Sequence, residues 1–218
     1  MDLYEALYTT RAMRRLAPDP IPEEVLLRIL DAAIRAPSAG NQHGFRFLVV
    51  RDVGTKKALQ VLYREILDEL YETRYAAAAQ AIRSGTDASQ QRVSASANHL
   101  ADHLHEAPVL LFAYGHIAGE SSVFPAVWSV CLAARAEGLG STVTTLLKSR
   151  REQVDALLGL PKGSGYQMAA MVPLGSPTGR WGVAQRRPLH ELVYTERWGE
   201  TPDWTCEQPL WPSREGVR

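Results

Sequence analysis

The chain is organised around residues 36–50, which read Ala36-Pro37-Ser38-Ala39-Gly40-Asn41-Gln42-His43-Gly44-Phe45-Arg46-Phe47-Leu48-Val49-Val50. Before this stretch, residues 21–35 carry apolar side chains at the spacing of an amphipathic helix. After it, residues 47–50 form an apolar run rich in β-branched side chains, which is typical of a buried strand. The small residues between them leave backbone N–H groups open to a flat or charged ligand. An ordinary connector has the same composition, so the loop alone decides neither interpretation.

The composition excludes several classes of protein. The chain has 218 residues, of which 45% are hydrophobic, enough for one domain with a substantial core. Its 24 basic and 24 acidic side chains cancel, which argues against a general nucleic-acid or anionic-membrane binder. Only four of the 24 basic residues are lysines, and the other 20 are arginines, which bind anions in a planar, bidentate manner.

The cysteines and the N-terminal sequence predict a cytoplasmic protein. Cys131 and Cys206 are far apart and follow no CxxC or metal-ligand pattern, so we expect a reduced, intracellular protein. Residues 1–5 have neither the basic nor the apolar region of a signal peptide, and no apolar run approaches the length of a membrane span.

Periodicity along the chain predicts a mixture of helices and strands. The predicted helices lie at residues 2–8, 21–35, 55–82, 93–106, 125–137 and 150–158. The predicted strands lie at residues 45–51, 108–114 and 166–174. We expect a mobile break at the polar, glycine-containing residues 84–91. Because no repeat or linker divides the chain, the mixture predicts a single α+β domain over residues 1–218.

Two apolar segments predict buried surfaces. The helix at residues 125–137 is apolar almost all round, so we expect it to be buried on most sides and to end at Gly138. The last forty residues show few signals of regular structure but hold four of the five tryptophans: Trp181, Trp198, Trp204 and Trp211. Exposed tryptophans forfeit their burial energy, so we expect this tail to pack on a surface of its own chain or of a partner.

Motifs for nucleophilic, zinc-protease, P-loop and dinucleotide-binding chemistry are absent from the sequence. The pair His99 and His103, with Asp102 and His105 close by, has metal-ligand spacing on a helix, but a solvated helix face is the favoured interpretation and no metal is expected. Arginines gather at two places, Arg11, Arg14 and Arg15 and then Arg186 and Arg187. Such clusters suit a phosphate group, although each alone is more simply read as surface charge.

Taken together and in order, five stretches resemble the FMN-dependent nitroreductase family. The family pattern has an arginine-rich R-R-S-x-R segment, a loop A-P-S-x-x-N-x-Q-P-W before a strand, a G-L-G-like turn, L-G-x-P after a strand and a basic pair before Pro-Leu. The matching stretches, which extend over residues 2–194, are Thr10–Arg14, Ala36–Phe45, Ala134–Gly140, Leu174–Pro177 and Arg186–Leu189.

The resemblance implies a three-layer sandwich with a central, mostly antiparallel sheet flanked by helices. It also implies a homodimer with FMN at the subunit interface, in which helix 125–137 lies in the dimer core and residues 180–218 wrap the partner. The residues implied to hold the FMN phosphate are Arg11, Ala12 (through its backbone), Arg14, Arg186 and Arg187. Those implied to line the flavin ring are Pro37, Ser38, Ala39 and Asn41 of the other subunit, with backbone N–H groups from Thr145 and Leu146.

This chain departs from the family pattern at two places. Thr10 and Ala12 replace an arginine and a serine, which removes one charge and one hydroxyl from the implied phosphate site. His43-Gly44-Phe45 replaces Q-P-W, which makes the loop more flexible and adds a titratable group, so His43 is a tentative catalytic residue. Candidates to line a substrate pocket, or simply to brace a helix or face water, are Tyr63, Tyr71, Tyr75, His99 and His103.

The activity that the resemblance implies is a ping-pong reaction in which NADH or NADPH reduces the flavin and a nitroaromatic, a quinone or a related flat acceptor reoxidises it. The sequence does not choose between NADH and NADPH. Relatives with the same fold that remove iodine from iodotyrosine or fragment flavin stay open as alternatives. A non-catalytic FMN-binding or sensor protein also stays open, because the phosphate segment is weakened, as does a structural dimer without FMN.

Overall fold

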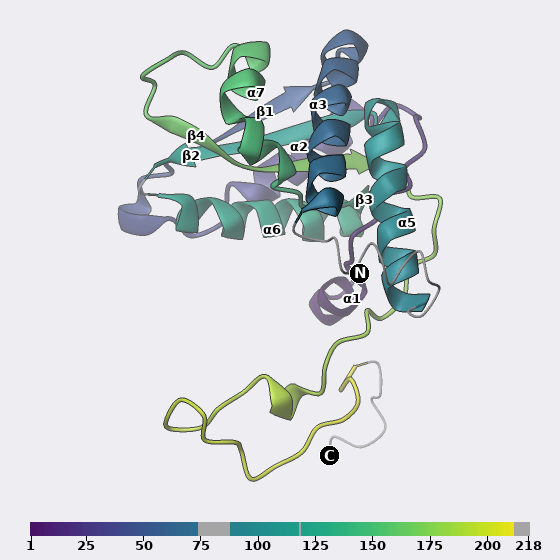
Figure 1. Ribbon diagram of the computed structural model, residues 1–218. Coiled ribbons are helices and arrows are strands. Elements are labelled where there is room, and N and C mark those ends of the chain that lie inside the picture. Colours follow the sequence, from purple (N-terminus) through teal and green to yellow (C-terminus); the bar gives the residue numbers. More distant parts are fainter. Residues whose placement is uncertain (74–87, 118, 212–218) are drawn as a thin grey trace. The chain divides into compact units, whose positions relative to one another are not determined.

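The computed structural model describes residues 1–73, 88–117 and 119–211 (Figure 1). Its contacts divide the chain into two compact units. The larger unit is residues 12–180, and the smaller one combines residues 1–11 with residues from 181 onward. The prediction of one domain over residues 1–218 stays a prediction.

A four-stranded antiparallel sheet forms the middle of the larger unit. Its strands are β1 (Phe45–Val50), β2 (Val109–His116), β3 (Gly140–Ser141) and β4 (Tyr166–Gly175), in the spatial order β1-β2-β4-β3. Strand β2 lies between β1 and β4 and is buried on both faces. Because side chains alternate along a strand, Leu111 points to one core and Phe112 to the other.

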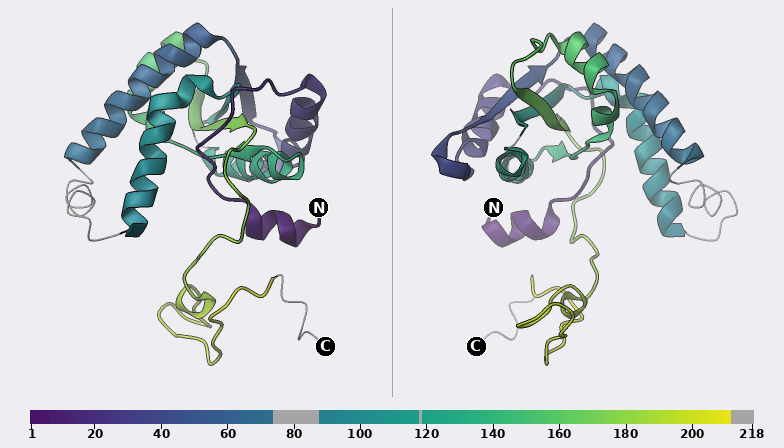
Figure 2. Two further views of the ribbon diagram at one scale, coloured as in Figure 1. Left: turned by 90° about the vertical axis from the view of Figure 1, so that its right-hand side faces the viewer. Right: turned by 60° about the vertical axis from the view of Figure 1, so that its left-hand side comes forward.

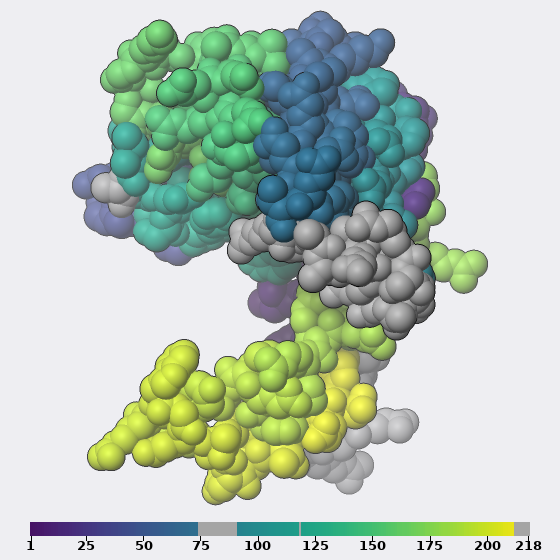
Figure 3. All heavy atoms as spheres, in the orientation of Figure 1, coloured from purple at the N-terminus to yellow at the C-terminus, as the bar shows by residue number. Residues whose placement is uncertain are grey.

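Helices cover both faces of the sheet (Figure 2). One face packs against α2 (Glu23–Ala33) and α6 (Glu120–Ala136), whose Ile29 and Val130 are fully buried. The other face packs against α3 (Val53–Glu72), α5 (Ala88–His103) and α7 (Arg151–Leu158). Figure 3 shows the layer of α3, α5 and α7 from outside, with the blue spheres of α3 between the green of α7 and the teal of α5. The predicted three-layer α+β sandwich is therefore confirmed.

Short 3-10 helices connect these elements at Ala39–Asn41, Leu104–Glu106 and Leu146–Arg150. The ends of the longer helices have local causes. The carboxylate of Asp52 accepts a hydrogen bond from the backbone N–H of Thr55 and caps α3. Gly138, at φ 77°, stops α6, and the N–H of Leu139 then bonds the carbonyl of Ala134 at 2.7 Å.

Residues 12–17 run along the sheet edge formed by β3 and the end of β4. The N–H of Met13 donates to the carbonyl of Ser141 at 2.8 Å, and that of Ala17 donates to the carbonyl of Ser176 at 2.8 Å. Gly140 permits this close approach, since a Cβ there would lie 2.9 Å from the Cβ of Met13. The segment that carries Arg14 is thus fixed by backbone hydrogen bonds.

The smaller unit consists of α1 (Leu3–Thr9), the 3-10 helix Leu189–Glu191 and otherwise irregular chain. The tail packs on α1 where the N–H of Ala184 donates to the carbonyl of Tyr8 and the Trp211 ring lies 5.6 Å from that of Tyr8. Trp198, in contrast, is 93% exposed. The prediction of packing on its own chain is therefore met at Trp211 and not at Trp198.

Two helices begin five residues earlier than predicted, and one strand was not predicted. Helix α6 begins at Glu120, five residues before Pro125. Burial of Val123 stabilises this first part of the helix despite the backbone donor that Pro125 lacks. Helix α5 begins at Ala88, so residues 88–91 of the predicted break are helical. The rest of that break, residues 84–87, lies outside the described residues. The part of the helix predicted at 55–82 that follows residue 73 also lies outside them. Strand β3 was missed because two residues are too short for a periodic signal.

Burial of α6 also differs from the prediction. Val123, Val127, Val130 and Ala134 point into the core, but Trp128 keeps 43% and Phe124 38% of its surface exposed. One side of this apolar helix is therefore uncovered in the single chain.

Candidate functional site

Arg14 is an arginine without a partner in a fixed segment of the larger unit. Its backbone follows Met13, which is bonded to Ser141, and its side chain is half-buried. No carboxylate or other acceptor among the described residues meets its guanidinium, whereas the neighbouring Arg15 bonds Nδ1 of His99 at 3.1 Å. An arginine of this kind offers a fork of free donors to an anion such as a phosphate.

The loop after β3 lies against β4 and carries Thr145 and Leu146. Thr144 exchanges two backbone hydrogen bonds with Met171, each 2.9 Å long. The N–H of Leu146 turns back to Oγ1 of Thr144 at 3.3 Å. Thr145 between them is exposed, and its N–H meets no acceptor in the described part of the chain. Of the two predicted flavin-facing amides, that of Thr145 is therefore the open one.

Tyr63 links α3 to this loop and to Arg14. It is 6% exposed, and its hydroxyl lies 3.1 Å from Oγ1 of Thr144. Burial raises the pKa of the Tyr63 hydroxyl, while the hydrogen bond to Thr144 and the positive charge of Arg14 oppose that rise. Tyr63 and Thr144 therefore lie in contact, although 81 residues separate them in sequence, and the charge of Arg14 acts on the same hydroxyl.

The loop at residues 37–43 follows α2 and is held by Ser38. Its Oγ accepts the N–H of His43 at 3.0 Å, and the N–H of Ala39 donates to Oγ of Ser122 at 3.1 Å. Gly40, Asn41 and His43 have positive φ angles of 59°, 53° and 49°. Pro37, Ala39 and Asn41 are exposed, whereas Ser38 is half-buried. The loop is therefore a fixed turn that presents small residues at the surface.

His43 is held by its backbone while its ring stays exposed. Its carbonyl accepts a hydrogen bond from Arg46, whose guanidinium also lies 5.3 Å above the ring of Tyr166. The imidazole lies 6.4 Å from the ring of Phe45 and has no hydrogen-bond partner within the described ranges. The structure therefore leaves the His43 imidazole available to a ligand.

The two predicted ligand-binding groups of the larger unit lie at opposite ends of α6. The loop at residues 37–41 bonds Ser122 near the N-terminus of α6 through the N–H of Ala39. The segment of Arg14 bonds Ser141, beyond the C-terminus of α6, through the N–H of Met13. A helix of 17 residues is about 25 Å long. One chain thus places Arg14 far from its own 37–41 loop.

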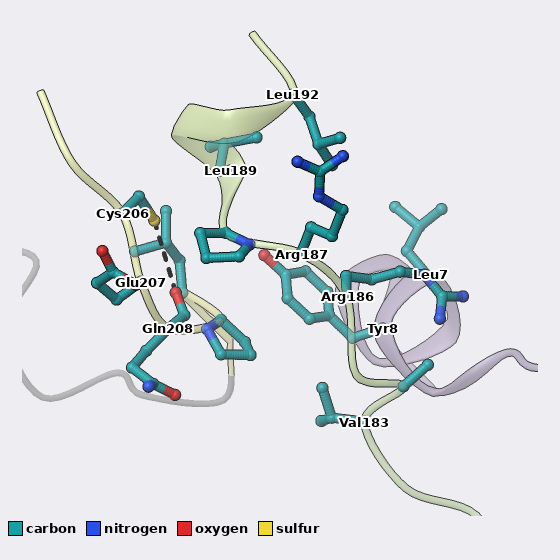
Figure 4. A pocket seen from close by; sticks show the side chains of 14 residues that line it. Leu7, Tyr8, Val183, Arg186, Arg187, Leu189, Leu192, Cys206, Glu207 and Gln208 are labelled. Carbon is teal, nitrogen blue, oxygen red and sulfur yellow. Dashed lines mark hydrogen bonds between the residues drawn. The ribbon is translucent and has the colours of Figure 1, made fainter. Parts of the chain in front are cut away.

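The remaining predicted phosphate ligands belong to the smaller unit. Arg11 follows α1, while Arg186 and Arg187 border a pocket of about 380 Å³ between α1 and the tail (Figure 4). Arg187 also pairs with Glu191 on the next turn, at 2.8 Å. The pocket is otherwise lined mainly by apolar side chains, among them Leu7, Tyr8, Leu189 and Leu192.

The other candidates have partners within the protein. His99 stacks on His103 with 4.3 Å between ring centroids, and Nδ1 of His103 lies 2.9 Å from the carboxylate of Glu106. Tyr71 bonds Oγ of Ser94 at 2.9 Å, and Tyr75 lies outside the described residues. Across the described ranges no cluster of three metal-ligating side chains occurs, and no helix there is long and apolar enough to cross a membrane.

Known proteins resemble this chain in sequence and in fold. The model of the nitroreductase family matches residues 7–176. A NADH dehydrogenase of Thermus thermophilus is 30% identical over 209 residues, covering 88% of this chain and 95% of that protein. A 5,6-dimethylbenzimidazole synthase of Rhodospirillum rubrum is 31% identical over 224 residues, covering 95% and 92%. The crystal structure of an oxidised iodotyrosine deiodinase bound to FMN and 3-iodo-L-tyrosine superimposes with a TM-score of 0.68 at 25% identity, covering 85% and 95%.

Proposed function

The chain belongs to the nitroreductase family, an oxidoreductase family, and on that premise we propose that it is an FMN-dependent oxidoreductase. In the proposed reaction NADH or NADPH is the electron donor, and a flat, electron-poor acceptor such as a nitroaromatic or a quinone is reduced. The name of the Thermus relative supports a reduced nicotinamide as the donor, and the FMN-bound deiodinase supports FMN as the cofactor.

The observation that carries the proposal is the free guanidinium of Arg14 beside a loop with an open amide. Arg14 has no anionic partner in the described part of the chain, and the N–H of Thr145, next to Thr144, is also unmet. A phosphate needs the first group, and the polar edge of a flavin needs the second. The residues present therefore fit FMN, despite the loss of one arginine at Thr10 and one hydroxyl at Ala12.

FMN would supply the two-electron redox chemistry that no side chain offers. We propose that Arg14 binds its phosphate together with the backbone of Ala12, while Arg11, Arg186 and Arg187 stay predicted phosphate ligands. The Thr145 amide would offer a hydrogen-bond donor to the polar edge of the flavin ring, and Leu146, whose own amide is taken, would cover that edge.

The proposed enzyme is a homodimer. Pro37, Ser38, Ala39 and Asn41 are assigned to the flavin ring, but α6 separates them from Arg14 by most of its length. Ring and phosphate of one FMN are joined by a single ribityl chain that is much shorter than this helix. Two chains packed through α6 would instead bring the loop of one to Arg14 of the other.

The uncovered side of α6 supports the same assembly. Phe124 and Trp128, one helical turn apart, expose large apolar surface that a second copy would bury. The exposed Trp198 likewise favours a tail that wraps the partner subunit. We further propose a cytoplasmic location, since both cysteines, Cys131 and Cys206, are free.

His43 is the proposed residue that acts on the acceptor from the loop of the other subunit. Hydrogen bonds to Ser38 and Arg46 hold its backbone, so the position of its Cα is fixed while the imidazole remains without a hydrogen-bond partner among the described residues. An imidazole in hydrogen-bond reach can donate a proton to an acceptor that is being reduced. His43→Gln should change the pH profile of turnover, and an identical profile from about pH 5 to about 8 would reject this role.

A second candidate function follows from the relatives. The synthase of Rhodospirillum rubrum is as similar as the Thermus enzyme and is covered over most of its length, and the deiodinase shares the fold. Fragmentation of reduced flavin by oxygen or removal of iodine from an iodotyrosine are therefore the alternatives to acceptor reduction. Product assays with oxygen, with 3-iodotyrosine and with a nitroaromatic separate the three.

The test of cofactor binding compares two adjacent arginines. Arg14→Gln should raise the Kd for FMN about tenfold or more, because a charge-assisted hydrogen bond contributes about 1.5–3 kcal/mol. Arg15→Gln is the matched control, since its guanidinium is taken by His99 and its loss should leave the Kd within about twofold. Equal effects of the two substitutions on FMN fluorescence titrations would refute the assignment.

A further inference from the structure

Tyr63 packs in the core through its ring and in addition makes a hydrogen bond through its hydroxyl. Its ring packs among the buried residues of α3, β2 and β4, where phenylalanine would fit equally well. Its hydroxyl reaches Oγ1 of Thr144 at 3.1 Å, across 81 residues of sequence. A buried hydroxyl is costly unless it has a partner, so this contact selects one position of the loop after β3.

Thr144 is fixed from three directions. Its backbone is paired with Met171 of β4 through two hydrogen bonds, and its hydroxyl receives the N–H of Leu146 in addition to meeting Tyr63. The next residue, Thr145, turns the chain into the 3-10 helix at Leu146–Arg150 with φ −115° and ψ 8°. The direction of the Thr145 N–H thus depends on how Thr144 is held.

We propose that Tyr63 is a positioning residue for the cofactor: through Thr144 it fixes the open N–H of Thr145 toward the flavin. This inference rests on the proposed function and adds to it a residue from α3, which none of the predicted cofactor contacts includes. Tyr63 touches no cofactor atom itself in this account. It determines where the donor of another residue points.

The location of Arg14 strengthens the assignment. The positive charge of Arg14 opposes the rise in the pKa of the Tyr63 hydroxyl, so the proposed phosphate ligand acts on the side chain whose hydroxyl also contacts Thr144. Loss of the Tyr63 hydroxyl should loosen the loop that carries Thr145, whereas the segment of Arg14 stays bonded to β3 through the N–H of Met13 and the carbonyl of Ser141.

The test is a double-mutant cycle on the two hydroxyls, read out as the Kd for FMN and the midpoint potential of the bound FMN. Tyr63→Phe and Thr144→Val should each raise the Kd about 2- to 12-fold and make the potential more negative. The double variant should be no worse than the poorer single variant, because both changes break the same contact. Thr144→Ser, which keeps the hydroxyl, should restore near wild-type values.

The matched control is Tyr71→Phe. Tyr71 lies eight residues further along α3, about 12 Å away, and its hydroxyl also bonds a serine hydroxyl, that of Ser94 on α5. This variant loses an equivalent hydrogen bond from the same helix but should keep the wild-type Kd and potential. A purely structural role of Tyr63 would make the two tyrosine variants behave alike.

The outcomes separate the two proposals. Wild-type protein that does not bind FMN overturns the proposed function and this inference with it. Wild-type protein that binds FMN, with unchanged Kd and potential in Thr144→Val, overturns this inference alone. If Tyr63→Phe does not fold, Thr144→Val and Thr144→Ser are compared instead, and an equal Kd and potential in these two variants refute the inference.

Discussion

Gly140→Ala is the substitution that most directly probes how the Arg14 segment is held. A Cβ on Gly140 would lie 2.9 Å from the Cβ of Met13, 2.9 Å from Cδ2 of Leu16 and 3.0 Å from the Cβ of Pro177. Two of these atoms are attached directly to the backbone, so no rotamer change relieves the contact. Residues 12–16 must instead move away from β3.

The expected cost follows from the size of the overlap. Adding a methyl group to a packed site of this kind costs about 1–3 kcal/mol. For a domain of this size each kcal/mol lowers Tm by about 2–4 °C, so the variant should melt about 2–12 °C below the wild type. Because the displaced segment carries Arg14, the Kd for FMN should also rise.

The assay is thermal unfolding by circular dichroism together with FMN titration. Gly179→Ala is the control, because a Cβ there meets only the terminal methyl of Met13, at 3.9 Å. The control should keep the wild-type Tm and Kd. Equal Tm and Kd in the two variants would refute the packing of residues 12–16 on β3.

Three further predictions concern the core, a histidine and the assembly. Phe112→Ala, at a fully buried site, should lower the free energy of unfolding by about 3–5 kcal/mol in urea titrations; a smaller loss would contradict its place between the layers. Burial, Arg15 and His103 lower the pKa of His99, so the unfolded chain takes up a proton first and stability should fall as pH drops through about 6.5. His99→Gln should flatten that fall, and an unchanged pH dependence of urea unfolding would argue against it. Trp128→Glu should give monomers in sedimentation experiments with weakened FMN binding, whereas intact dimers would exclude packing through α6.

Most of the fold was predictable because its signals are local. The apolar run of β2 and the 3.6-residue periodicity of α2 and α3 depend on neighbouring residues. The bounds of β2 and α2 and the start of α3 were predicted to within a few residues, and the predicted part of the α3 helix beyond residue 73 lies outside the described residues. The errors arose where tertiary contacts decide. Helix α6 begins before Pro125 because Val123 in its first turns is fully buried in the core. Strand β3 is too short for a sequence signal and forms by pairing with β4.

The candidate site was predictable only as a set of separate motifs. Arg14 and residues 37–41 were identified through the order of motifs along the chain, which does not tell how far apart they lie in one subunit. The contact of Tyr63 with Thr144 carries no sequence signal, because 81 residues separate the two and each is ordinary in its own element. Likewise, only the structure shows that Ala39 and Met13 are bonded near opposite ends of α6.

The measurement that tests the central proposal most directly is the visible absorption spectrum of the purified protein reconstituted with FMN, before and after anaerobic addition of NADPH and then of NADH. We predict a yellow protein with a flavin spectrum that bleaches with at least one of the two donors. A colourless protein that cannot be loaded with FMN would contradict the cofactor assignment. A yellow protein that neither donor bleaches would contradict the oxidoreductase assignment and favour FMN binding without turnover.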